Sequence, residues 1–135
     1  MSDTLKAGLT ATRRVEIDRD STISFMGDDC RVYSTPNLLY DIEMACRDLL
    51  LANIEAGKDS VGTRVELDHV GATLMGMKVE LQVRIAEVQG RSVTFEVSGS
   101  DGIDAICTCR HQRFVVDVAK TEQRLAARAL KAGLA

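Results

Sequence analysis

A long apolar stretch in the first half of the chain, residues 34–57, constrains the fold more than any other. Ser34 or Thr35 suits the N-cap of a helix, and Pro36 then suits the first helical position, where its missing N–H costs nothing. Gly57 is expected to end the helix. Because apolar side chains recur at helical spacing between these limits, we predict one long helix with one face packed against the rest of the fold.

One acidic residue, Glu43, lies on the apolar face of this predicted helix. The other acids of the helix share the opposite face, and the neighbours of Glu43 are Leu39, Cys46, Leu50 and Ile54. Burying an ionised carboxylate without a partner costs free energy. Glu43 is therefore either a structural member of an ion pair or a catalytic group.

Alternating patterns on both sides of the helix predict five strands. In the strand that starts at Ser60, the residues expected to share the apolar face are Val61, Thr63, Val65, Leu67 and His69. This pattern places His69 on the side that packs against the helix. The other expected strands cover residues 9–17, 79–85, 93–97 and 103–118, and residues 120–131 favour a helix.

The composition is that of one globular domain over residues 1–135, with a helical tail from about residue 119 to residue 135. The net charge of −3 gives no reason to expect nucleic acid or an anionic membrane as a partner. No apolar run is long enough to span a bilayer. The first residues lack the apolar core of a signal peptide, so we expect a cytoplasmic protein.

The four cysteines are Cys30, Cys46, Cys107 and Cys109. In a cytoplasmic chain the thiols are expected to be reduced. A zinc site needs a second ligand pair at finger-like spacing, and Cys107-Thr108-Cys109 is not such a pair. We therefore expect no metal site and interpret these cysteines as small buried side chains.

The predicted order is one strand, the long helix and then four consecutive strands joined by short turns. Antiparallel hairpins in series with one helix across a face make an α+β fold. One helix covers only one face of such a sheet, and its edge strands need pairing or cover. We therefore expect a homodimer or a higher oligomer.

Four short motifs occur in order along these predicted elements. They are STP at residues 34–36 followed by Glu43 and Ala45-Cys46, SVGT at 60–63, DHVGAT at 68–73 followed by Gly76, and DGIDAI at 101–106 followed by HQR at 111–113. Together they resemble the hotdog-fold thioesterases, and within these the fluoroacetyl-CoA thioesterases, over about residues 33–116. The resemblance implies a hotdog fold, in which an antiparallel sheet wraps around one long central helix.

The resemblance also implies roles for individual residues. The catalytic set of the family matches Thr35, Glu43 and His69. The glycine whose main chain helps to position water or the thioester carbonyl matches Gly62, and an arginine of acyl recognition matches Arg113. The loop after the histidine differs, because the family often has prolines where this chain has Leu-Met-Gly at residues 74–76. In the family this loop helps to shape the environment of the acyl group and of CoA, so the difference bears on which substrate is bound.

Most of these residues also have a purely structural interpretation. A threonine at a helix start is commonly an N-cap, a histidine on an apolar strand is commonly a core residue, and Gly62 suits a β-bulge. Arg113 suits either acyl recognition or a salt bridge at an interface. Arg91, in a predicted turn, suits either contact with CoA phosphates or plain solvation. We interpret His111 as structural.

The resemblance thus implies an acyl-CoA thioesterase acting on a short-chain substrate, such as an α-substituted, fluoroacetyl-like acyl-CoA. No cofactor is expected, since CoA is part of the substrate. Glu43 is expected to act with Thr35 and His69, either by direct attack through a covalent acyl intermediate or by activating water. Two other functions stay open: a non-catalytic acyl-CoA-binding hotdog module, and a hotdog enoyl-CoA hydratase or dehydratase.

Overall fold

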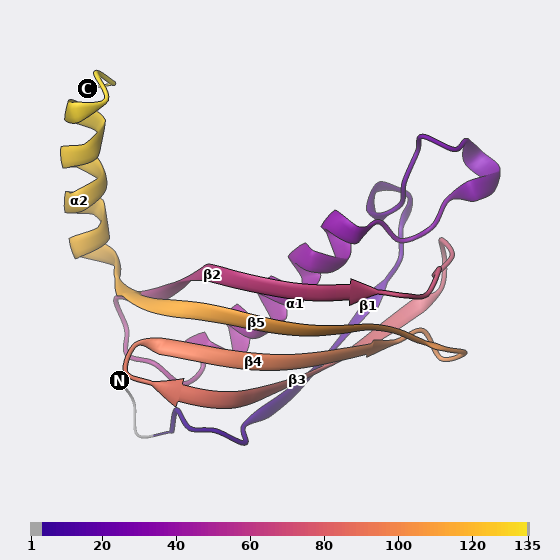
Figure 1. Ribbon diagram of the computed structural model, residues 1–135, viewed down its shortest axis with the longest axis horizontal. Coiled ribbons are helices and arrows are strands. Elements are labelled where there is room, and N and C mark those ends of the chain that lie inside the picture. Colours follow the sequence, from indigo (N-terminus) through magenta and orange to yellow (C-terminus); the bar gives the residue numbers. More distant parts are fainter. Residues whose placement is uncertain (1–3, 135) are drawn as a thin grey trace.

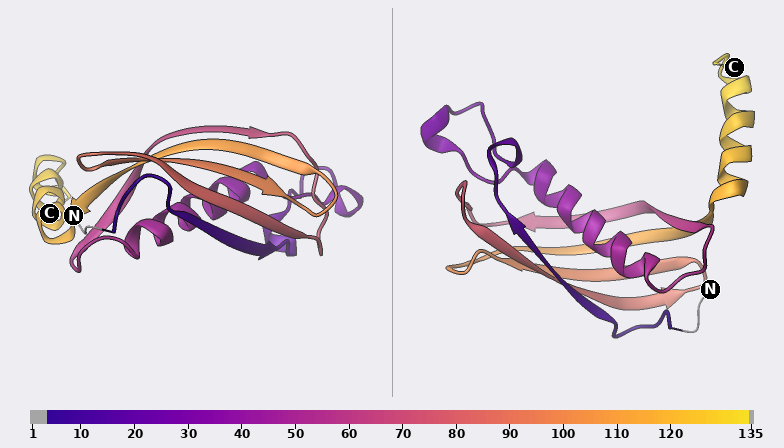
Figure 2. Two further views of the ribbon diagram at one scale, coloured as in Figure 1. Left: turned by 90° about the horizontal axis from the view of Figure 1, so that it is seen from below. Right: turned by 180° about the vertical axis from the view of Figure 1, so that it is seen from behind.

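The computed structural model describes residues 4–134 as one antiparallel sheet with a long helix across one face and a projecting C-terminal helix (Figure 1). The elements are β1 (Thr10–Glu16), two 3-10 turns (Arg19–Ser21 and Asp28–Cys30), α1 (Thr35–Leu51), β2 (Lys58–His69), β3 (Lys78–Gln89), β4 (Ser92–Ser100), β5 (Ala105–Asp117) and α2 (Val118–Lys131). The strand order is β1-β3-β4-β5-β2, and the sheet curves around α1 (Figure 2). This is the predicted α+β arrangement.

The start of α1 agrees with the prediction, and its end does not. Ser34 is the N-cap, because its hydroxyl oxygen accepts a hydrogen bond from the Asn37 N–H at 3.2 Å. The helix ends at Leu51, six residues before Gly57. Asn53 ends the helix there. Its side-chain amide donates to the Leu49 carbonyl at 2.8 Å, and its main-chain N–H donates to the Leu50 carbonyl at 2.9 Å. Gly57, with a φ of +85°, instead turns the chain into β2.

The core lies between α1 and the inner face of the sheet. The alternating residues of β3 and β4 are buried as predicted, and they pack with the apolar residues of α1: Val79, Leu81, Val83, Ile85, Val93, Phe95 and Val97 with Leu38, Ile42 and Leu50. β3, β4 and β5 follow one another as antiparallel neighbours. This part of the sheet is the predicted series of hairpins.

β2 does not take its predicted place beside β3. It pairs with β5 at the far edge of the sheet, and residues 70–77 cross the end of the sheet to reach β3. Main-chain hydrogen bonds fix this crossing, from Tyr33 N–H to the Thr73 carbonyl at 2.8 Å and from Gly76 N–H to the Ile17 carbonyl at 2.7 Å. The connection is therefore held by the chain before α1 and does not form a hairpin turn.

A β-bulge divides the inner face of β2. The register with β5 shifts between Gly62 and Arg64, so Thr63 is the extra residue. Ser60 and Gly62 face α1 before the bulge, and Val65, Leu67 and His69 face it after the bulge, opposite the inward residues of β5. The prediction of one apolar face was correct for these last three residues and wrong for Val61 and Thr63, because the bulge reverses the alternation.

The C-terminal helix α2 continues directly from β5 and extends past the β2 edge, away from the sheet (Figure 1). Asp117 is its N-cap, accepting from the Lys120 N–H at 3.1 Å, and none of its residues is buried. Neither α2 nor any other helix in residues 4–134 is long and apolar enough to cross a membrane.

Three of the four cysteines, Cys46, Cys107 and Cys109, are buried in the core as predicted. The prediction was wrong for Cys30, which lies exposed in the second 3-10 turn before α1. Burial raises the pKa of Cys107 and of Cys109 to about 11. These thiols are therefore protonated and unreactive near neutral pH, as small apolar core residues are.

Candidate active site

The first of two polar clusters lies where α1 begins and β2 ends. Thr35 is in the first turn of α1, and its hydroxyl Oγ1 lies 2.8 Å from Nδ1 of His69, the last residue of β2. Tyr33 stands edge-on to the His69 ring, with 6.3 Å between the ring centroids. The predicted orientation of His69 toward the helix is thus confirmed, and the histidine meets the predicted threonine.

Burial lowers the pKa of His69, and a contact with the Gly71 main chain partly opposes this shift. The ring is therefore neutral near pH 7 and can accept the Thr35 hydroxyl proton at Nδ1. In that tautomer the ring proton is on Nε2, which is buried and has no hydrogen-bond partner in the described chain. A hydroxyl and a neutral imidazole in direct contact make the pairing of a nucleophile with a base.

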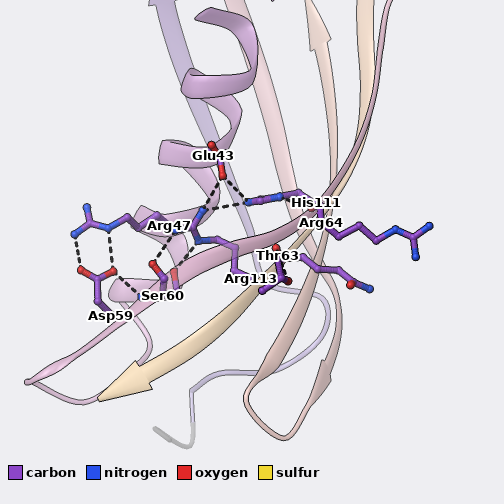
Figure 3. A network of polar contacts seen from close by, with 9 residues as sticks. Glu43, Arg47, Asp59, Ser60, Thr63, Arg64, His111 and Arg113 are labelled. Atoms are coloured by element: carbon purple, nitrogen blue, oxygen red, sulfur yellow. Dashed lines mark hydrogen bonds and ion pairs between the residues drawn. The ribbon is translucent and has the colours of Figure 1, made fainter. Parts of the chain in front are cut away.

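The second cluster surrounds Glu43, two turns further along α1 (Figure 3). Its carboxylate oxygen Oε1 lies 3.5 Å from Nη1 of Arg113 and 3.8 Å from Nε2 of His111. The Glu43 side chain is 31% exposed, so it is neither fully buried nor fully solvated. The carboxylate thus lies beside a buried cation and keeps access to the surface.

Arg113 is held in a fixed position by three further contacts. Its Nε donates to Ser60 Oγ at 2.7 Å, Nη2 to the Ser60 carbonyl at 2.9 Å, and Nη1 to Nε2 of His111 at 3.1 Å (Figure 3). Arg47 and Asp59 form a bidentate ion pair that also binds the Ser60 N–H, which anchors this end of β2. The guanidinium therefore faces Glu43 in one defined geometry.

His111 is neutral in this cluster. Its Nδ1 lies 2.8 Å from the Arg64 carbonyl, which can only accept, so Nδ1 carries the proton and Nε2 accepts from Arg113. Burial lowers the pKa of His111, and the nearby Arg113 charge lowers it further. Glu43 and Arg113 are consequently the two opposite charges of the cluster.

Gly62 lies directly against the Glu43 carboxylate. A Cβ atom added at position 62 would lie 2.5 Å from Oε1 of Glu43 and 3.2 Å from Cε1 of His111. No side chain fits there unless Glu43 moves. The bulge at Thr63 creates this contact, because it sets Gly62 and Ser60 on the inner face opposite Arg113 and Val115.

The structure therefore brings the predicted residues together in two groups, Thr35 with His69 and Glu43 with Gly62 and Arg113. Eight residues of helix separate the groups, which is a rise of about 12 Å along α1. Within one chain they do not touch. Arg91 joins neither group, since it is an exposed residue of the β3–β4 turn whose Nη1 lies 3.3 Å from the Val115 carbonyl.

Sequence reasoning assigned His111 a structural role and did not place it beside Glu43. The signal for this placement is the spacing of His111 and Arg113, because residues two apart on a strand share a face. Within residues 4–134 no three His, Cys, Asp or Glu side chains gather in a way that could hold a metal ion.

The sequence profile of a family described as fluoroacetyl-CoA-specific thioesterase matches residues 17–119, which include both polar clusters. The chain belongs to this family. A fluoroacetyl-CoA thioesterase of Streptantibioticus cattleyicolor is 32% identical over 89 residues, which are 66% of this chain and 64% of that relative. The matched stretch thus spans somewhat less than two thirds of the relative's length.

Two solved structures extend the likeness from sequence to fold. A fluoroacetyl-CoA-specific thioesterase variant in complex with fluoroacetate and CoA superposes with a TM-score of 0.81 at 25% identity, covering 87% of this chain and 99% of that one. A hotdog-like protein from Thermanaerovibrio acidaminovorans superposes with a TM-score of 0.83 at 21% identity, covering 90% and 91%. The predicted hotdog fold and the predicted membership of the fluoroacetyl-CoA thioesterase family are therefore confirmed.

Proposed function

We propose that this protein is a thioesterase that hydrolyses a short-chain acyl-CoA to the free acid and CoA. Membership of the fluoroacetyl-CoA-specific thioesterase family supports this reaction class. The single observation that carries the proposal is the 2.8 Å contact between the Thr35 hydroxyl and Nδ1 of a neutral His69. A fluoroacetyl-like acyl group is proposed from the family alone, and no cofactor is required.

In the covalent route, Thr35 Oγ1 attacks the thioester carbonyl carbon while its proton passes to Nδ1 of His69. The C–S bond then breaks, and the departing sulfur of CoA takes the proton. Glu43 then accepts a proton from a water molecule, this water hydrolyses the threonine ester, and the proton passes to the Thr35 oxygen as the bond between that oxygen and the acyl carbon breaks. In the alternative route, Glu43 accepts a proton from water, and this water attacks the thioester carbonyl carbon directly. The C–S bond then breaks, and the proton passes from Glu43 to the departing sulfur of CoA.

The start of α1 offers limited help to the developing oxyanion. Pro36 has no N–H, the Asn37 N–H donates to the Ser34 hydroxyl, and the Leu38 N–H donates to the Ser34 carbonyl. In the described chain this leaves the Thr35 N–H as the unbonded donor of the first turn, together with the positive end of the helix dipole. We propose that this N–H supports the oxyanion.

The separation of the two clusters supports a site shared between subunits. β2 is an edge strand with unpaired main-chain groups and exposed apolar side chains, with Val61 48% and Val65 37% exposed. Such an edge is suited to pair with a second copy around a two-fold axis. We propose a homodimer joined at β2, in which the gap between the Thr35 and Glu43 clusters becomes an enclosed pocket.

The other site residues then have supporting roles. The contacts of Arg113 suit a positioning residue that holds the Glu43 carboxylate in one orientation. The absence of a side chain at Gly62 lets its main chain approach the Glu43 carboxylate, where a water molecule or the thioester carbonyl could be bound. The exposed guanidinium of Arg91 is proposed to contact CoA phosphates.

A panel of acyl-CoAs that differ in chain length and α-substituent tests the function, with a thiol-reactive dye reporting CoA release. We expect turnover that is fastest for short acyl groups, including fluoroacetyl-CoA. Binding of acyl-CoA without thiol release would instead assign a non-catalytic binding module. Mass spectrometry of the protein after rapid mixing distinguishes the two routes, since only the covalent route yields an acylated Thr35.

A further inference from the structure

The helix α2 lacks a packing partner among residues 4–134 of its own chain. None of its 14 residues is buried, and both further views show it standing clear of the sheet (Figure 2). Isolated helices of this length are only marginally stable in water. A surface outside the described chain is therefore needed to keep α2 folded.

α2 has two chemically different faces at about 100° per residue. The apolar face carries Val118, Leu125, Ala126 and Ala129, with Leu130 at its border and Glu122 as its one acid. Leu125 is 59% exposed and Leu130 is 66% exposed. The basic face carries Lys120, Arg124, Arg128 and Lys131, and none of these forms an ion pair within the described part of the chain.

A second exposed apolar surface lies at the opposite end of the sheet, where β2 ends at His69. This His69-end surface consists of Val70, Leu74, Met75 and Ile103 in the loops between strands, all exposed. The neighbouring segment before α1 adds the exposed acids Asp20 and Asp29, which have no ion-pair partner among residues 4–134. The surface is thus apolar with an acidic margin.

We propose that α2 of one protomer docks on the His69-end surface of a second copy of this chain. The inference rests on the homodimer joined at β2. Antiparallel pairing of two β2 strands around a two-fold axis sets the Lys58 end of each strand beside the His69 end of the other. α2 begins at the Lys58 end, where the Val118 N–H donates to the Gly57 carbonyl at 3.0 Å, and it extends past β2 toward the side that the second copy would occupy (Figure 1).

The helix cannot reach the same surface of its own chain. β2 has 12 residues and therefore spans about 40 Å, whereas α2 is only about 21 Å long. On the second copy, the apolar face of α2 meets apolar loops, and its basic face lies near Asp20 and Asp29. The loop 70–77 directly follows His69. By covering this loop, α2 of each protomer would lie beside the Thr35–His69 pair of the other protomer.

Cross-linking between differently tagged chains tests this docking. In a Cys30→Ser background, one chain carries Leu125→Cys and the other Ile103→Cys, and mild oxidation follows mixing. We expect a disulfide between the two chains, several-fold more abundant than with Ala127→Cys. This control position lies in the same helical turn as Leu125 but on the face turned away from the apolar stripe.

Hydrogen exchange gives a second readout on the full chain with its natural cysteines. Leu125→Glu is expected to speed amide exchange in residues 70–77, whereas Ala127→Glu, which adds the same charge, leaves it unchanged. The docking is overturned if the wild type is dimeric and releases CoA, but the cysteine variants form no cross-link and Leu125→Glu does not change the exchange of residues 70–77. That result leaves the proposed function intact. A monomeric wild type overturns both the docking and the β2 dimer. Protection of α2 only on phosphatidylglycerol vesicles would assign it to a membrane surface and also overturns the docking.

Discussion

The Glu43 carboxylate occupies the space that a side chain at position 62 would need, with 2.5 Å between Oε1 and the position of an added Cβ atom. The two residues come from different elements, α1 and β2, and the β-bulge at Thr63 sets them face to face. A side chain added at position 62 would therefore displace the Glu43 carboxylate. Substitutions at the two positions, made singly and together, test this contact.

Gly62→Ala is expected to displace the carboxylate end of the flexible Glu43 side chain and to lower the free energy of unfolding by about 1 kcal/mol, at the low end of the range for overpacking. Urea denaturation measures this loss. In a Glu43→Ala background only the 3.2 Å approach to Cε1 of His111 remains, so the same substitution should cost less. Equal costs in both backgrounds would show that the contact does not constrain Gly62.

Thr35→Val removes the hydroxyl that contacts His69 and keeps the shape of the side chain. If Thr35 is the nucleophile, kcat should fall by a factor on the order of 10²–10⁴ with little change in stability. Ser34→Ala is the matched control, because it removes the N-cap and should cost about 1 kcal/mol of stability while retaining turnover. Normal turnover by Thr35→Val would favour the route in which Glu43 activates water.

The buried neutral histidine His111 makes stability depend on pH. Its pKa is lowered by burial and by Arg113, so the unfolded chain binds a proton at a higher pH than the folded chain does. The contribution of the neutral His111 to the free energy of unfolding is therefore fully present above about pH 6.5, the ordinary pKa of histidine. It is lost as the pH falls from there toward the lower pKa of the folded state. His111→Gln should flatten the stability profile in this window, and an unchanged slope would contradict the neutral assignment.

Arg113 and Arg91 should respond very differently to replacement by methionine. Arg113→Met leaves Glu43 without its cation and Ser60 without its donor, so we expect a loss of about 3–5 kcal/mol in urea denaturation. Arg91→Met removes one exposed side chain and its hydrogen bond to the Val115 carbonyl, so it should cost no more than about 1 kcal/mol. If Arg91 contacts CoA phosphates, its replacement raises KM several-fold at constant kcat, and an unchanged KM would remove it from the site.

Much of the fold follows from local pattern. The alternation in residues 79–85 and 93–97 identified the inward side chains of β3 and β4, and His69 was correctly placed toward the helix. The end of α1 was missed because the Asn53 side chain bonds the last carbonyls well before Gly57. The position of β2 was missed because its partner, β5, lies far along the chain and leaves no local signal.

The sequence supplied candidate residues for the site but not their arrangement in space. The family resemblance assigned site roles to Thr35, His69, Glu43, Gly62 and Arg113. No spacing in the sequence indicated that the first two of these residues form one cluster and the other three another. The bulge at Thr63 is one extra residue in an otherwise regular alternation, and it decides which side chains of β2 face Glu43. The contact of His111 with Arg113 was missed because inward and outward residues of β5 are not distinguished by hydrophobicity alone.

The central claim is that the Thr35–His69 and Glu43 clusters together hydrolyse acyl-CoA. The most direct measurement is CoA release from a short acyl-CoA by wild type and by Glu43→Gln, compared at equal folded concentration. Glu43→Gln keeps the shape of the side chain and removes its charge and basicity. We predict rapid release by wild type and a kcat lower by a factor on the order of 10²–10⁴ for the variant. Equal turnover by the two proteins, or no release by either, would contradict the account.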